Sequence, residues 1–309
     1  MGKSESRRGE LPCKKIDVHT HLSGRAGEMT AKRRLALNGA LGIERSVILP
    51  TAGYMGITKQ PFTADVIGNA AARRVCLRSP EAFSWFCNVC PAGSEQIGQL
   101  LRRYRDQGAC GVGEFASQLP FDHSQVESVL AWCRELGLPF LFHMSPEENW
   151  GYGVVDRPGL PLLEKELQKF PELQLIGHSK VFWYEISKGT EHPSPALRNS
   201  CPAGAVREGR LADLFRAFPN LWGDLSAAGG SNALLRDEDY GLSFLKEFQD
   251  RLLFGTDVLD EAGLSPLGGW LDRMYFQGKI TETVYRKVCR DNALRLLKIG
   301  PARERAAEF

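Results

Sequence analysis

Two histidines separated by one residue, His19 and His21, are the feature of the sequence that most directly indicates chemistry. His19 lies in a short run, residues 15–20, that has the composition of a β-strand, and His21 directly follows this run. Because successive side chains of a strand alternate, both imidazoles are expected on the same side. Two imidazoles placed in this way can bind one metal ion. A structural role for the pair is the alternative that the motif alone leaves open.

Four further residues could complete a metal site. His143 and His178 stand at the ends of two later strand candidates, and the carboxylates Glu114 and Asp257 end two others. Imidazole and carboxylate ligands suit Zn²⁺, and also Mn²⁺, Fe²⁺, Co²⁺ or Ni²⁺. Polar groups without partners and like charges both cost free energy when they are buried together, and a divalent cation offsets both costs. The alternative is that these residues lie at a barrel rim and bond to one another.

The elements that must position these residues repeat along the chain. Short runs rich in β-branched and aromatic residues alternate with amphipathic helical patterns, at a pitch of about 34 residues, close to the roughly 30 that one strand–helix unit needs. Eight such units predict an α/β fold of the (β/α)8 TIM barrel type. A doubly wound open sheet is the alternative, although the first turn lacks its glycine-rich motif. The strand candidates are residues 15–20, 45–49, 83–89, 111–115, 139–143, 173–178, 221–225 and 251–256.

One domain is expected over residues 1–309, with a core of about 14–298 and flexible ends at 1–12 and 302–309. The barrel is expected to be distorted by long loops after strands two and six, residues 51–61 and 179–202. Loops that follow strands lie on the catalytic face of such a barrel, so both are expected to border the site. Tolerated insertions are the alternative.

Two helices can be assigned in detail. Residues 124–136 place apolar side chains on one face, with Asp122 and Gln125 arranged like a capping box and Gly137 as the terminator. Residues 285–297 are expected to form the closing helix of the barrel.

Composition excludes several classes of protein. The 39 basic residues nearly balance the 37 acidic ones, which disfavours a general binder of nucleic acids or membrane surfaces. No apolar run approaches the 20 residues of a membrane span. The polar first ten residues do not have the pattern of a secretory signal, so a cytoplasmic location is expected. The eight cysteines fit that compartment as buried thiols.

The motifs together resemble the amidohydrolase superfamily, specifically the amidohydrolase-related group that includes aminocarboxymuconate-semialdehyde decarboxylase. The resemblance extends over residues 16–297 and is specific for the superfamily, though weak for any one substrate. It implies a metal-dependent TIM-barrel enzyme. The matching segments are residues 17–21, 170–178, 218–226, 251–257 and 292–297.

The resemblance also implies roles for individual residues. His19, His21 and His143 would bind the metal. Asp257 would bind it or lie beside it and act as general base toward the metal-bound water. His178 would bind a second metal or polarise the substrate.

Glu114 stands where many members of the superfamily carry a bridging lysine or glutamate, so no carboxylated lysine is expected. This glutamate also makes the set similar to TatD-type deoxyribonucleases, whereas the single-metal decarboxylases of the group generally work without it. The resemblance therefore implies one or two divalent ions, with Zn²⁺ as the first expectation.

Four residues in mouth loops could bind the substrate. Arg25 and Lys180 could pair with a carboxylate, and Tyr54 and Trp183 could stack on a ring; solvated charges and loop packing are the alternatives. Asp224, at the end of the seventh strand candidate, could orient a ligand histidine.

The leading functional prediction is a metal-dependent hydrolase that attacks an amide, ester or lactone of a small molecule with a metal-activated water. The alternative is a metal-dependent, non-oxidative decarboxylase of a small unsaturated or aromatic carboxylic acid. A nuclease is disfavoured because the mouth loops lack a dense basic stripe. A non-catalytic binding protein is disfavoured because every expected ligand position is filled. Homodimer formation is left open.

Overall fold

The computed structural model describes residues 10–23, 29–51, 66–91, 94–190, 192–259 and 263–300. The predicted loop at 51–61, apart from Thr51, and most of the two terminal segments predicted to be flexible lie outside these residues. The described strands are β1 (Lys15–Thr20), β2 (Ile43–Ile48), β3 (Phe83–Trp85), β4 (Val112–Phe115), β5 (Phe140–Ser145), β6 (Val154–Val155), β7 (Leu175–His178), β8 (Leu221–Asp224) and β9 (Leu252–Leu253).

All strands except β6 belong to one closed barrel. Parallel pairing runs through β1-β2-β3 and through β4-β5-β7-β8-β9. The first gap is bridged where the Cys87 N–H donates to the Gly111 carbonyl and the Gly113 N–H donates to the Cys87 carbonyl, both at 2.9 Å. The second is bridged where the Asp257 N–H donates to the His19 carbonyl at 2.8 Å. The predicted (β/α)8 architecture is confirmed.

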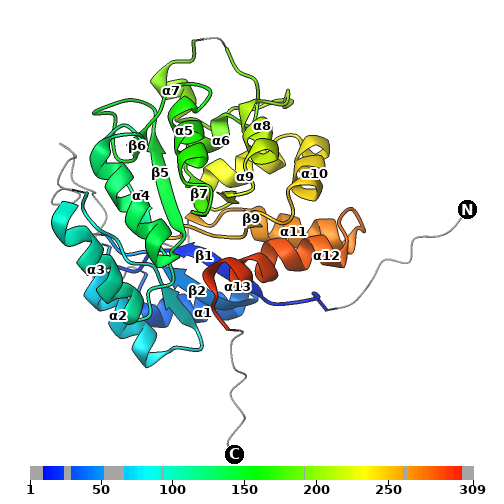
Figure 1. Cartoon of the computed structure of the whole chain (residues 1–309). Helices are drawn as coiled ribbons and strands as arrows, with labels where there is room; N and C mark the ends of the chain where they lie inside the picture. Colours follow the sequence, from blue (N-terminus) through cyan, green and yellow to red (C-terminus); the bar gives the residue numbers. More distant parts are fainter. Residues whose placement is uncertain are drawn as a thin grey trace, which may run out of the picture.

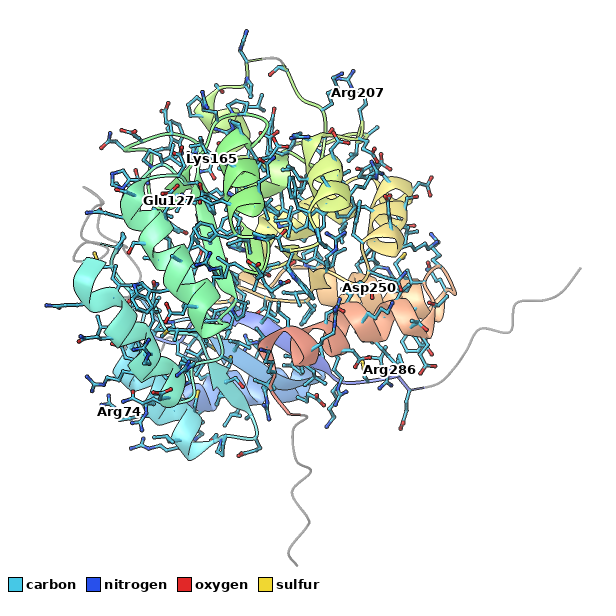
Figure 2. The ribbon with its side chains drawn as sticks, viewed as in Figure 1. Arg74, Glu127, Lys165, Arg207, Asp250 and Arg286 are labelled. Carbon is cyan, nitrogen blue, oxygen red and sulfur yellow. The ribbon has the colours of Figure 1, made fainter. Side chains whose placement is uncertain are left out.

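The helices surround the strands, as Figure 1 shows. Charged side chains such as Arg74 on α2 and Glu127 on α4 project from this outer layer in Figure 2. In the described part of the chain, no helix has the length and apolar character needed to cross a membrane. The helices are α1 (Ala31–Leu41), α2 (Asn69–Arg78), α3 (Ser94–Asp106), α4 (Ser124–Leu136), α5 (Pro161–Lys169), α6 (Lys180–Tyr184), α7 (Pro195–Arg198), α8 (Arg210–Ala217), α9 (Ala227–Leu235), α10 (Glu238–Glu247), α11 (Leu267–Phe276), α12 (Glu282–Arg286), the π-helical turn η2 (Lys287–Asp291) and α13 (Asn292–Leu297).

Helix α4 has the bounds predicted from the sequence, but its cap differs. The N-cap is His123, whose side chain accepts a hydrogen bond from the Gln125 N–H at 3.2 Å. Asp122, the predicted capping residue, instead pairs with Lys165 of α5 at 2.8 Å. Gly137 ends the helix in the left-handed conformation, φ +65°, as predicted.

The predicted closing helix is interrupted by the π-helical turn η2. At this turn the Val288 carbonyl accepts a hydrogen bond from the Phe254 N–H at 3.0 Å. A wider turn changes which carbonyls are free at that point. The closing helix is thereby joined to the chain directly after β9.

The predicted loop at residues 179–202 contains the short helices α6 and α7. It starts directly after His178 and contacts the carboxyl end of β5, because Arg198 of α7 donates to the Pro146 carbonyl at 2.7 Å. The segment therefore lies on the same side of the barrel as the ends of the strands.

Apolar side chains fill the barrel interior. Ile16 and Val18 of β1 meet Val47, Leu141 and Ile176 from three other strands in one buried cluster. Because several strands contribute to it, this cluster occupies the inside of the barrel, and a larger cluster packs the helices onto its outside. A filled interior is the normal state of this fold.

A buried carboxylate connects the first and last strands of the barrel. Asp17 accepts hydrogen bonds from the His19 N–H at 3.0 Å and from the Thr256 N–H at 2.9 Å. Its second oxygen accepts from the Thr256 hydroxyl at 2.6 Å and pairs with the guanidinium of Arg34, which comes from α1. Asp17 and Arg34 are both fully buried. This network fixes the position of the chain on both sides of His19 and Asp257.

We expect Arg34→Met to lower the free energy of unfolding by about 3–5 kcal/mol, because it leaves the Asp17 carboxylate buried without its cation. Lys32→Met is the matched control, since Lys32 lies on the exposed face of the same helix. Denaturant unfolding of both variants checks the prediction. Equal stability of the two variants would show that the ion pair is dispensable.

Candidate metal centre

All six residues predicted as metal ligands meet at the carboxyl ends of the barrel strands. They come from five segments of backbone that are far apart in sequence but converge in the closed barrel. Their potential ligand atoms form three overlapping groups, within each of which all atoms lie within 4.8 Å of one another. The groups are His19, His178 and Asp257; His19, His21 and Glu114; and Glu114, His143 and His178.

Four of these residues form the tightest part of the cluster. The Nε2 atoms of His19 and His21 lie 3.2 Å apart. Glu114 Oε2 lies 3.5 Å from the first and 3.2 Å from the second. Asp257 Oδ1 lies 3.4 and 3.3 Å from the same two atoms. A tetrahedral shell with bonds of about 2.0–2.1 Å has edges of about 3.3–3.4 Å. The donor atoms and their spacing therefore fit a divalent cation.

The other two histidines contact the outer oxygens of the same carboxylates. His143 Nδ1 lies 2.5 Å from Glu114 Oε1. His178 Nε2 lies 3.7 Å from that oxygen and 3.6 Å from Asp257 Oδ2. The resemblance grouped His143 with His19 and His21, whereas here its contact with the cluster passes through Glu114. Glu114 and Asp257 each direct one oxygen toward His19 and His21 and the other toward His143 or His178. The donors could therefore hold one ion or two.

Asp224 orients two of the histidines from behind. Its Oδ2 lies 2.6 Å from His19 Nδ1 and 3.1 Å from His178 Nδ1. His21 is held in the same way, because its Nδ1 lies 2.9 Å from the Leu49 carbonyl. A proton on each Nδ1 leaves each Nε2 free to bind a cation. These contacts match the orienting role predicted for Asp224.

The backbone near Asp257 is adapted to the crowding of these side chains. Asp257 has a left-handed conformation, φ +54°, which Asp tolerates better than most residues. Two residues earlier, a Cβ atom on Gly255 would lie 2.9 Å from Asp224 Oδ1 and 3.2 Å from His19 Cβ. Only glycine lets the chain pass this close to the histidine and its partner.

The buried carboxylates hold positive charge in the cluster. Burial by itself lowers the pKa values of His19 and His21, but Asp257 and its neighbouring carboxylates outweigh burial and raise them to about 9 and about 10. Burial raises the pKa of Asp257, but the charge of His19 and hydrogen bonds from His178 and His21 outweigh it and hold this pKa below its usual range. The centre therefore attracts cations, whether protons or a metal ion.

Two of the four residues predicted to bind the substrate, Lys180 and Trp183, are described by the structure. Arg25 and Tyr54 lie outside the described residues. Lys180 is exposed at the start of α6. Trp183 is buried, packs against Gly223 and donates from Nε1 to the Asp224 carbonyl at 2.8 Å. Its packing therefore supports Asp224 and does not favour the predicted stacking on a substrate.

Sequence reasoning missed two residues next to the cluster. The Ser226 hydroxyl donates to Asp224 Oδ2 at 2.9 Å and lies 3.1 Å from His178 Nδ1. The ring of Tyr152 lies against the ring of His143, with centroids 4.3 Å apart. The only available signal for Tyr152 was its place in the loop that follows the strand of His143.

We expect Asp224→Asn to weaken binding of a divalent metal by about 10- to 100-fold, because His19 and His178 lose the carboxylate that fixes their tautomers and directions. Competition with a chelating dye measures the affinity. Asp213→Asn, an exposed carboxylate of α8, is the control. An Asp224→Asn protein that is folded and keeps the affinity of the parent would contradict this role.

Comparison with known structures supports the fold independently. The 2,6-dihydroxybenzoate decarboxylase from Rhizobium matches with a TM-score of 0.60 and 18% identity, covering 93% of this chain and 99% of that one. A 5-carboxyvanillate decarboxylase from Novosphingobium aromaticivorans, complexed with manganese, matches with a TM-score of 0.64 and 14% identity, covering 94% and 97%. A probable 2-pyrone-4,6-dicarboxylic acid hydrolase from Acinetobacter baumannii matches with a TM-score of 0.57 and 13% identity, covering 93% and 100%. At these identities the likeness establishes the fold.

No curated protein matches the sequence. A family model described as amidohydrolase matches residues 16–299, which include every residue of the cluster. Because this match extends over nearly the whole length, the chain belongs to the amidohydrolase family.

Proposed function

We propose that this protein is a divalent-metal-dependent carboxy-lyase that releases carbon dioxide from a small aromatic acid. The observation that carries the proposal is the set of His19, His21, Glu114 and Asp257, whose donor atoms have the spacing of cation ligands. It lies in a barrel similar to decarboxylases of dihydroxybenzoate and carboxyvanillate. The sequence favoured acyl hydrolysis and kept decarboxylation as the alternative. The structural relatives support the alternative better.

The residues of the cluster have the properties that this reaction needs. When an aryl carboxylate loses carbon dioxide, the carbon–carbon bond breaks, its electron pair stays on the ring carbon, and that carbon takes a proton. A bound divalent ion supplies the positive charge that polarises a substrate oxygen. Imidazole and carboxylate donors fit Mn²⁺ as well as the Zn²⁺ expected from the sequence, and three of the similar structures contain manganese.

His178 and Asp257 are the proposed path of the proton. Burial lowers the pKa of His178, but hydrogen bonds that its ring donates to Asp224 and Asp257 outweigh burial and raise this pKa well above its usual value. His178 Nε2 lies 3.6 Å from Asp257 Oδ2, so a proton can pass between the two side chains. The Asp257 side chain is 22% exposed, against 7% for Glu114, so it is the carboxylate of the cluster that a substrate reaches most easily.

Acyl hydrolysis is the second candidate, and the similarity to a probable 2-pyrone-4,6-dicarboxylic acid hydrolase favours it. In this reaction the same Asp257 carboxylate would take a proton from the attacking water. Both reactions therefore use one constellation, and they differ in whether carbon dioxide is a product.

Protein loaded with Mn²⁺ or Zn²⁺ is expected to release carbon dioxide from a hydroxylated benzoic acid and to lose this activity when a chelator removes the metal. Readdition of the ion is expected to restore it. A parallel screen of lactones, esters and amides is the comparison. Turnover of these compounds, with no carbon dioxide from any aromatic acid, would replace the proposal by its hydrolase alternative.

We expect Asp257→Asn to reduce kcat by about 10²- to 10⁴-fold, because the amide cannot carry the proton that Asp257 passes to or from the substrate. Asp250→Asn, a 61% exposed carboxylate that pairs with Lys287, is the control. Melting temperature and metal content are measured for both variants. If Asp257→Asn kept more than half of the parent kcat, the proton carrier would have to be sought elsewhere in the cluster.

A further inference from the structure

The segment that follows β5 leaves the strand of His143 and returns beside it. Strand β6 pairs in parallel with the last two residues of β5, matching Met144 with Val154 and Ser145 with Val155. Residues 146–153 therefore form a closed loop at the carboxyl end of this strand, and Figure 1 shows β6 next to that end of β5. The loop thus begins and ends within a few residues of the metal cluster.

The loop is also attached to the chain that follows β4, the strand of Glu114. The Val155 N–H donates to the Leu119 carbonyl at 2.9 Å, and the Gly153 N–H donates to the Ala116 carbonyl at 3.2 Å. Gly153 has φ +124°, and a Cβ atom there would lie 2.6 Å from the Met144 carbonyl carbon. Glycine is needed for this close approach, so the path of the loop over the two strand ends is well defined.

Arg198 holds both ends of the segment. Its Nη1 donates to the Pro146 carbonyl at 2.7 Å and to the Asp156 carbonyl at 2.8 Å, at the first and last residues of 146–156. The side chain is buried, and Glu185 is its nearest carboxylate at 3.9 Å. Burying a guanidinium is costly, and here one nitrogen of the buried group donates to both carbonyls, which holds the two ends of the segment close together.

The held segment presents aromatic surface beside the cluster. In the described part of the chain, large exposed hydrophobic side chains are few, and two of them, Trp150 at 40% and Tyr152 at 38% exposure, lie in this loop. The Tyr152 ring is tilted by 41° against the ring of His143, with 4.3 Å between their centroids. An exposed ring next to a reactive centre gains free energy when another flat ring covers it.

We propose that Tyr152 is a specificity-determining residue that stacks on the planar ring of the substrate, and that Arg198 is the positioning residue that holds Tyr152 in place. Arg198 acts through the loop 146–156 by fixing the distance between its ends. The inference rests on the proposed function, because it assigns the ring of an aromatic acid to that same site.

The test compares the binding of two acids of similar size and equal charge to the metal-loaded full chain. Benzoate has a flat aromatic ring, and cyclohexanecarboxylate does not. Calorimetry gives the ratio of their dissociation constants, which is expected to favour benzoate. Tyr152→Leu should reduce this preference by about threefold to tenfold, whereas Tyr152→Phe, which keeps the ring, should stay within about twofold of the parent. An unchanged preference in Tyr152→Leu, or a parent that binds neither acid, overturns the proposal.

The role of Arg198 is tested by a double-mutant cycle. Arg198→Met should reduce the preference for benzoate as much as Tyr152→Leu does, with unchanged metal content, and the double variant should show no further loss. Arg198→Gln, a shorter side chain that keeps a polar group at the buried position, serves if Arg198→Met does not fold. Arg207→Met, at an exposed arginine labelled in Figure 2, is the control. Additive losses in the double variant would show that Arg198 does not act through Tyr152.

Failure of the proposed function can be told apart from failure of this inference. If no aromatic acid yields carbon dioxide but the benzoate preference depends on Tyr152, the reaction is wrong and ring recognition stands. If carbon dioxide is released and Tyr152→Leu leaves both the preference and KM unchanged, the reaction stands and ring recognition is wrong.

Discussion

The mutual compensation of buried charge at the barrel mouth is the constraint on which the structure depends. Glu114 and Asp224 are buried and Asp257 is mostly buried among four histidines, and each carboxylate contacts at least two imidazoles. Isolated, any of these groups would destabilise the fold, since an unpaired buried charge costs several kcal/mol. Together they form a site whose charge is balanced by protons or by a divalent cation. The same arrangement that makes the cluster tolerable therefore makes it able to bind a metal.

The side chains of the cluster must be held at fixed positions, and a few buried polar contacts hold the backbone segments that carry them. Asp17 fastens the chain beside His19 to the chain beside Asp257, so the two ligand-bearing segments cannot move independently. Asp224 does the same for His19 and His178 across the barrel, and Trp183 supports Asp224 by a hydrogen bond to its carbonyl. The parallel pairing of the closed barrel brings the cluster residues together, and the polar contacts behind them fix the directions of their side chains.

The sequence was sufficient for those features that follow from periodicity and residue type. The strand order and the convergence of His19, His143 and His178 at one mouth follow from alternation and spacing along the chain. The roles of Tyr152 and Arg198 could not be inferred, because they depend on a loop that returns beside its own strand and on a helix some 50 residues away along the chain. Asp122 is a second example. The local sequence pattern predicts that it caps α4, but its carboxylate pairs with Lys165 of the neighbouring helix α5, and the pattern does not reveal this contact.

The metal centre alone does not determine the reaction. A cation held by histidines and carboxylates, with Asp257 as the most accessible acid, suits both attack by water and loss of carbon dioxide. What distinguishes the reactions is how the substrate lies over the centre, and that depends on groups outside it. In the described residues, the aromatic surface of the loop 146–156 is set against His143 and fixed by a buried arginine. A surface of this kind favours a substrate with a flat ring, and an aromatic acid has in its carboxylate the group that decarboxylation removes.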